Sequence, residues 1–288
     1  MEPRPTPGSY EAVVFAGGGC RCFWQAGFWS TAAPALGLEP RVVAGVSAGA
    51  ALASAVFADV VDPVREEFGR RVAANRRNAY PANALAGDPV FPHEEIYRGT
   101  MLATLDEQAL ARLHAGPEIR IALGRRPAWS GPRVAVVLGL VAYLAEQPRR
   151  HGVHGVWGRR LGFRHETASA RDCATPEELV ELVLHSSCTP PITPFYNRAG
   201  DVVFDGGIVD AAPVEAVPQE ARTLVLLTRS FPDEALPQRP DLRYVAPSQP
   251  VPVAKWDYTS PDRVERTYDL GRRDGERFAA AFDESRAA

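Results

Sequence analysis

The chain has 288 residues, of which 45% are hydrophobic and 23% are charged, and its formal net charge is -3. This is the composition of a globular protein that can bury a core, and the length fits one α/β unit. The small net charge gives no overall attraction to nucleic acid or to an anionic membrane. The longest apolar run, Val134 to Ala145, is shorter than the ~20 residues of a spanning helix, which argues against a membrane-embedded protein.

The cysteines and the N-terminus indicate a cytoplasmic protein. Cys20, Cys22, Cys173 and Cys188 show no CxxC motif and no zinc-like spacing with histidine. We therefore expect four reduced thiols. The first ten residues are rich in proline and lack the apolar segment of a signal peptide, so residues 1–9 are predicted to form a loose leader. Peripheral contact with a membrane is left open.

The first predicted strand, residues 11–16, runs into the glycine-rich loop Gly17-Gly18-Gly19-Cys20-Arg21. A helix is predicted over residues 23–33, ended by Pro34 and Gly37. Such a loop exposes backbone amides that can hold an anion. A nucleotide pyrophosphate is one candidate, but Cys22 stands where the dinucleotide fingerprint needs its last glycine. The other candidate is the oxyanion of an acyl-transfer reaction.

A second strand and helix surround Gly45-Val46-Ser47-Ala48-Gly49. Val42 and Val43 precede this segment, and an alanine-rich helix is predicted over residues 48–58. Strand, tight turn and helix with a serine at the bend are typical of a nucleophile elbow. A chance match in a chain rich in glycine and alanine is the alternative. Because a nucleophilic serine creates an oxyanion, Ser47 favours the acyl-transfer interpretation of the glycine loop.

The middle of the chain is less informative. Helices are predicted over residues 62–77 and, as a pair or one long helix, over 96–114, and a strand over 119–123. Residues 119–165 then carry nine arginines against one acid, Glu146, a local charge of +8. This basic region is either a docking surface for phosphate-bearing lipid or a membrane, or a solvated segment whose arginines pair with acids elsewhere. The nine are Arg120, Arg125, Arg126, Arg133, Arg149, Arg150, Arg159, Arg160 and Arg164.

In the last third, Thr175-Pro-Glu-Glu178 is a capping box that opens a helix through Leu184. The proline-rich loop 186–195 follows. A short strand over 202–204 then ends in Asp205-Gly206-Gly207. Further along, a strand is predicted over 223–228, an irregular segment over 229–260, and a final helix that begins at Ser260-Pro261.

A serine hydroxyl needs a base to become a nucleophile. None of the six histidines follows Asp205, so the usual order of serine, acid and histidine cannot be built with that acid. Asp205 ends a strand and precedes two glycines, which favours a Ser47–Asp205 dyad. The alternatives are a simple turn aspartate, or a base from the middle histidines His151, His154 and His185.

These three motifs, in this order, resemble the patatin-like phospholipase family. The glycine loop, the elbow and the Asp-Gly-Gly turn match its pattern between about residues 11 and 228, with Cys22 in place of a glycine. The resemblance implies a three-layer α/β/α fold with a central, mostly parallel sheet. We expect a single domain over residues 10–288, with core motifs in 11–58 and 170–228, a divergent region 59–169 and a C-terminal extension 229–288.

The resemblance also implies a mechanism without a metal or organic cofactor. Ser47 would attack a fatty-acyl ester and Asp205 would act as the base, in a phospholipase A or lysophospholipase. The partners expected are an acyl-ester lipid and, through residues 119–165, a membrane surface, but no nucleic acid. A catalytically weak or inactive protein that binds lipid or acyl chains is the alternative. The implied oxyanion hole is Gly17, Gly18, Gly19 and Arg21, and the implied supports of the elbow and turn are Gly45, Gly49, Gly206 and Gly207.

Overall fold

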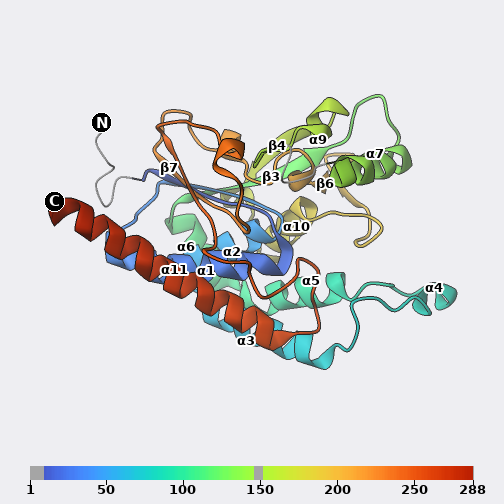
Figure 1. Ribbon diagram of the computed structural model, residues 1–288. Helices are drawn as coiled ribbons and strands as arrows, with labels where there is room; N and C mark the ends of the chain where they lie inside the picture. Colours follow the sequence, from blue (N-terminus) through green and yellow to red (C-terminus); the bar gives the residue numbers. More distant parts are fainter. Residues whose placement is uncertain (1–9, 146–151, 288) are drawn as a thin grey trace.

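The computed structural model describes residues 10–145 and 152–287, whose centre is an eight-stranded sheet (Figure 1). Hydrogen-bonded neighbours follow one another in the order β5-β6-β3-β2-β1-β7-β8, and β4 also pairs with β3. Strands β3, β2, β1, β7 and β8 are parallel to one another, and β4, β5 and β6 add antiparallel pairs. The strands are β1 (Ala12–Phe15), β2 (Val42–Val46), β3 (Glu118–Arg125), β4 (Arg164–Ser169), β5 (Tyr196–Arg198), β6 (Asp201–Asp205), β7 (Thr223–Leu226) and β8 (Leu242–Val245).

Helices flank this sheet on both faces, so the predicted α/β class is confirmed. Most of the described helices gather on one face, whereas the other carries two helices, 3₁₀ turns and loops (Figure 1). Strand β1 shows both faces: Val13 and Phe15 pack in the larger core cluster, and Ala12 and Val14 in a second one. The first layer holds α1 (Phe23–Leu36), α2 (Ala48–Phe57), α3 (Val61–Ala74), α5 (His93–Thr104), α6 (Glu107–Ala115), α10 (Pro176–Ser186) and α11 (Pro261–Ala287), and the second holds α7 (Pro132–Ala145) and α9 (Trp157–Arg160).

Helix α11 runs along α1 and closes the first layer (Figure 1). The indole of Trp24 donates a 2.8 Å hydrogen bond to Asp274, and the rings of Phe28 and Phe278 lie 5.2 Å apart between centroids. The face of α11 that carries Asp274 and Phe278 is therefore the one packed on α1. The C-terminal extension also supplies β8, which pairs with β7.

Several elements differ from the expectations. Pro34 lies inside α1, which ends only at Gly37, a residue in the left-handed conformation that commonly ends helices. Of the two alternatives expected for residues 96–114, the structure has the pair, α5 and α6, and it begins earlier, at His93. Strands β4, β5 and β8, the short helix α4 (Asn83–Ala86) and helix α7 were not predicted. The expected leader 1–9 and residues 146–151, with Arg149, Arg150 and His151, lie outside the described residues.

Candidate active site

The turn between β2 and α2 has the geometry predicted for an elbow. Ser47 occupies it with φ 54° and ψ −136°, a backbone conformation that costs energy in a residue other than glycine. The side chain lies at the N-terminus of α2 and is 7% exposed. Gly49 packs under the glycine loop so closely that a Cβ there would lie 2.4 Å from the Phe15 carbonyl oxygen. Gly45 likewise faces Ala50 across the turn.

The register of the sheet brings Asp205 to the same place. Strand β4 pairs with residues 120–125 of β3 and so occupies one edge of that strand. Strands β2 and β6 must therefore share the other edge, where Val46 is paired with Ala122 and Asp205 with Leu123. Since β6 runs antiparallel to β3, the carboxyl ends of β2 and β6 meet head-on. Ser47 and Asp205 come together at this junction, with Gly206 packed against Ala122.

Asp205 is a buried carboxylate, 4% exposed. Burial raises its pKa, because desolvation disfavours the charged form. Three contacts oppose this rise: the positive charge of Lys255, the N–H of Gly207, which donates to Oδ1 at 2.7 Å, and the hydroxyl of Ser47. The carboxylate therefore faces the serine and is held by the turn that follows it.

The glycine loop has two backbone N–H groups without an acceptor among the described residues. The N–H of Gly17 donates to the Ala211 carbonyl at 2.8 Å. Within the described part of the chain, the N–H groups of Gly18 and Gly19 have no acceptor. Gly19 has φ +59°, and a Cβ there would lie 2.1 Å from the Lys255 carbonyl oxygen. Arg21 donates from Nε to the Gly18 carbonyl at 3.2 Å, so it braces the loop.

Ser47, Asp205, Gly17, Gly18 and Arg21 line one cavity of about 350 Å³. Its wall is largely apolar, which suits an acyl chain, and its cations suit an anionic group. The cavity is also lined by Tyr143, Leu144, Ile208, Arg229 and Lys255.

Two further residues of this site were not predicted as site residues from the sequence. Ser186 accepts the Ser47 N–H at 2.8 Å and donates to the Ala122 carbonyl at 2.6 Å, so its buried hydroxyl ties the elbow to β3. Lys255 lines the cavity from the segment predicted as irregular, and its ammonium lies over the rings of Tyr143 and Trp256. That it is the only lysine of the chain is the one clue the sequence holds.

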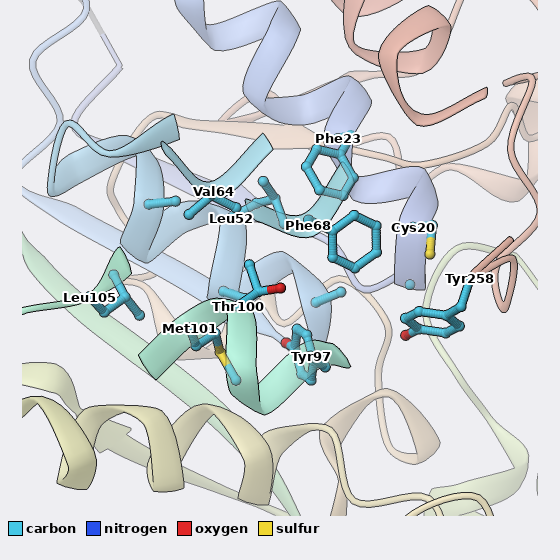
Figure 2. Close-up of a pocket in the computed structure, with 14 residues that line it drawn as sticks. Cys20, Phe23, Leu52, Val64, Phe68, Tyr97, Thr100, Met101, Leu105 and Tyr258 are labelled. Carbon is cyan, nitrogen blue, oxygen red and sulfur yellow. The ribbon is translucent and has the colours of Figure 1, made fainter. Parts of the chain in front are cut away.

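A second, narrower cavity of about 40 Å³ lies beside the elbow, among α2, α3 and α5. Figure 2 shows Phe23, Leu52, Phe68 and Met101 around it, with the rings of Tyr97 and Tyr258. Gly19 and Ala48 also line it, so it reaches the residue next to Ser47.

Cys22, the departure from the family pattern, lines neither of these two cavities. It is fully buried at the end of the 3₁₀ turn η1 (Gly19–Cys22), and its thiol donates to the Ala16 carbonyl at 3.5 Å. All four cysteines are buried and free.

No histidine of the described residues hydrogen-bonds to Ser47 or lines the cavity of about 350 Å³. His154 is held between Asp210, at 2.7 Å, and the hydroxyl of Tyr244, at 2.9 Å. His165 contacts the Gly206 carbonyl at 3.1 Å, behind the turn. Among the described residues there is also no group of three or more His, Cys, Asp or Glu placed to hold a metal.

A mixed, mostly parallel sheet flanked by helices, with a serine at a strained strand-to-helix turn, defines an α/β protein with the turn geometry that nucleophile elbows have. The family model of the patatin-like phospholipases matches residues 13–218. The chain therefore belongs to the patatin-like phospholipase family, and its fold agrees with the α/β/α fold of that family. Membership supports a lipid acyl hydrolase in general.

The chain was also compared with solved structures and with curated proteins. Among solved structures, one match is the crystal structure of VipD from Legionella pneumophila, which is 11% identical with a TM-score of 0.45. The match covers 95% of this chain and 67% of that one. A search of curated proteins found no match.

Proposed function

We propose that the protein is a serine esterase that cleaves fatty-acyl esters of phospholipids or lysophospholipids with a Ser47–Asp205 dyad. The observation that carries this proposal is the convergence of both side chains on one cavity, at the junction of β2 and β6, with no histidine against the hydroxyl among the described residues. Family membership supports the reaction class.

The first half-reaction forms an acyl-enzyme. Asp205 takes the hydroxyl proton as the Ser47 Oγ attacks the ester carbonyl carbon. The carbonyl oxygen becomes an oxyanion, and the unpaired N–H groups of Gly18 and Gly19 are its donors in this proposal. Arg21 positions these donors through the Gly18 carbonyl. The intermediate then collapses, the C–O bond of the ester breaks, and the leaving alcohol takes the proton from Asp205.

The second half-reaction releases the fatty acid. Asp205 takes a proton from water, whose oxygen attacks the acyl carbon of the Ser47 ester. A second tetrahedral intermediate collapses, and Ser47 Oγ recovers a proton from Asp205 as the fatty acid leaves. Every proton therefore passes through one carboxylate. The rise of its pKa on burial makes Asp205 a stronger base than an exposed aspartate.

The charges of the cavity favour a phosphate-bearing substrate. Arg21, Arg229 and Lys255 line it together with a single carboxylate, Asp205. Guanidinium and ammonium groups are the common partners of phosphate oxygens in proteins. This supports a phospholipid or lysophospholipid over a neutral glyceride.

Contact with a membrane surface belongs to the same proposal, but the arginines give it limited support. Arg120, Arg125, Arg126 and Arg159 all form ion pairs with carboxylates. The Arg160 guanidinium lies over the Trp157 ring. In the described part of 119–165, only Arg133 and Arg164 have neither an ion pair nor a ring contact. In this proposal their charges attract the anionic head groups of a membrane. No helix of the described residues is long and apolar enough to cross a membrane.

A fluorophosphonate probe tests the proposal, because it reacts with an activated serine. We expect the wild type to be labelled and Ser47→Ala to be unlabelled. A panel of phosphatidylcholine, lysophosphatidylcholine and diacylglycerol, with product analysis, then identifies the ester that is cleaved. Lipid binding without labelling or cleavage would contradict the proposal and identify an inactive binding protein.

A further inference from the structure

Helix α7 has its small residues inside and its large apolar residues outside. Ala135, Gly139 and Ala142 form the buried stripe. The outer face carries six large side chains that are between 47% and 61% exposed. An ordinary surface helix shows the opposite arrangement. The six are Val134, Val137, Leu140, Val141, Tyr143 and Leu144.

The inner face shows why the helix is arranged in this way. A Cβ at Gly139 would lie 3.3 Å from the Cδ1 of Ile208 and 3.8 Å from the Phe163 ring. Ala135 packs in one cluster with Phe163 and Phe204. Only small residues fit this close contact, so the valines and leucines cannot turn inward without displacing the helix. Their exposure is a consequence of the packing of α7.

The outer face continues into the candidate active site. Tyr143 and Leu144, at the end of α7, line the cavity that contains Ser47 and Asp205. The centroid of the Tyr143 ring also lies 5.1 Å from the ammonium of Lys255, another residue that lines the cavity. Ile208, which the inner face contacts, is only three residues beyond Asp205. Whatever covers the outer face of α7 therefore adjoins the cavity.

The charges around this face match an anionic lipid surface. The segment from residue 119 to residue 145 contains no aspartate or glutamate. Arg133 is exposed in the first turn of α7, and Trp129, just before the helix, is 71% exposed. Apolar side chains flanked by arginine, tryptophan and tyrosine are typical of helices that lie in a membrane interface.

We propose that the outer face of α7 docks on a lipid surface, with its valines and leucines in the boundary of the acyl chains and Trp129 and Tyr143 at head-group level. The inference rests on the proposed function, since it takes the substrate to be a lipid held in a membrane. Docking in this orientation places the mouth of the cavity against the bilayer, so a lipid can reach Ser47 without crossing water.

Vesicle cosedimentation tests this docking in the inactive Ser47→Ala background, where hydrolysis cannot change the membrane. The vesicles are phosphatidylcholine, with and without phosphatidylglycerol. We expect Val137→Glu/Leu140→Glu to reduce the bound fraction roughly tenfold or more, because two apolar contacts are replaced by charges. The matched control is Leu85→Glu, a 94% exposed leucine on α4, which should bind like its parent. Unchanged binding of the α7 variant would overturn the proposal.

Two further measurements keep the outcomes separate. In the active background, the α7 variant should hydrolyse a soluble short-chain ester at the parental rate, which shows that it is folded. Light scattering then tests whether α7 is instead an interface between copies: a wild-type dimer that the substitution converts to a monomer, without loss of vesicle binding, would also overturn the proposal. If docking depends on α7 but fluorophosphonate does not label Ser47, the proposed function fails and the docking stands.

Discussion

The backbone N–H of Ser47 donates to the side chain of Ser186, 139 residues away in the sequence, at 2.8 Å. The same hydroxyl donates to the Ala122 carbonyl of β3 at 2.6 Å. One buried oxygen thus connects the strained turn to the strand on whose edge β2 and β6 meet. Because both bonds are made by a single hydroxyl, Ser186 can fix where the Ser47 side chain points without contacting the substrate.

Ser186→Ala should therefore impair both stability and rate. It leaves the buried N–H of Ser47 without an acceptor, which costs about 1–3 kcal/mol in the free energy of unfolding. If the turn relaxes, kcat on a soluble ester should fall with little change in KM. The neighbouring Ser187→Ala is the control, since Ser187 donates to the Val183 carbonyl within α10. Equal kcat values for the two variants, measured beside urea unfolding, would show that Ser186 is only structural.

Asp205→Asn should separate activity from stability. Loss of a general base lowers the rate by about 10²–10⁴-fold. The free energy of unfolding at pH 7 should not fall, because burial raises the pKa of Asp205 and so makes its charged form costly in the folded state. Asp201→Asn, at the other end of β6 and paired with Arg126, should keep the activity. Hydrolysis that survives in Asp205→Asn would exclude this carboxylate as the base.

Lys255→Met should move the acid limb of the pH–rate profile. The positive charge of Lys255 lowers the pKa of Asp205, against the rise caused by burial. Without that charge the pKa rises further, so the base becomes protonated at a higher pH and the rate falls earlier on acidification. Profiles of kcat/KM for a neutral soluble ester measure the shift. In Lys255→Arg the rate should fall at the same acidic pH as in the wild type, because the positive charge is kept. If the acid side of the profile does not shift in Lys255→Met, the charge of Lys255 does not set the pKa of Asp205.

The sequence was most informative where structure is local. Ser47 and the Gly17 loop lie in strand–turn–helix units whose conformation depends on neighbouring residues, and the predicted elbow and loop occupy those positions. Asp205 could be predicted as the end of a strand. That it meets Ser47 follows from the pairing of β2 and β6 on one edge of β3, which no local pattern specifies.

Long-range contacts explain what could not be predicted. Ser186 and Lys255 were not predicted as site residues, and they reach the site from α10 and from a loop before α11. For Arg125 and Arg126 the sequence left open a docking surface or pairing with acids elsewhere, and the structure pairs them with Glu166 and Asp201 of other strands. The run 134–145 is apolar on every side, so its sequence cannot show which face of α7 is buried.

His93 should make the protein less stable in mild acid. Its ring is 6% exposed, hydrogen-bonded through Nδ1 to the Tyr258 hydroxyl and packed against Tyr97 and Trp256. Burial, with a smaller effect of the Lys255 charge, lowers its pKa from 6.5 to about 4. The folded state thus favours the neutral ring, so this stabilisation is complete above pH 6.5 and is lost as the pH falls toward 4.

The loss amounts to about 3 kcal/mol over this range. His93→Phe keeps a ring in the site but cannot take up a proton. Its free energy of unfolding at pH 7 is the reference, since the variant loses the Nδ1 bond to the Tyr258 hydroxyl and also loses the buried Nε2, which has no partner among the described residues. Between pH 7 and pH 4 the free energy of unfolding of the variant should fall less than that of the wild type. The variant lacks the titration of His93, and the other titrating groups are common to both proteins. Urea unfolding across this range measures the difference, and parallel curves would show that His93 takes up its proton equally easily in the folded and unfolded states.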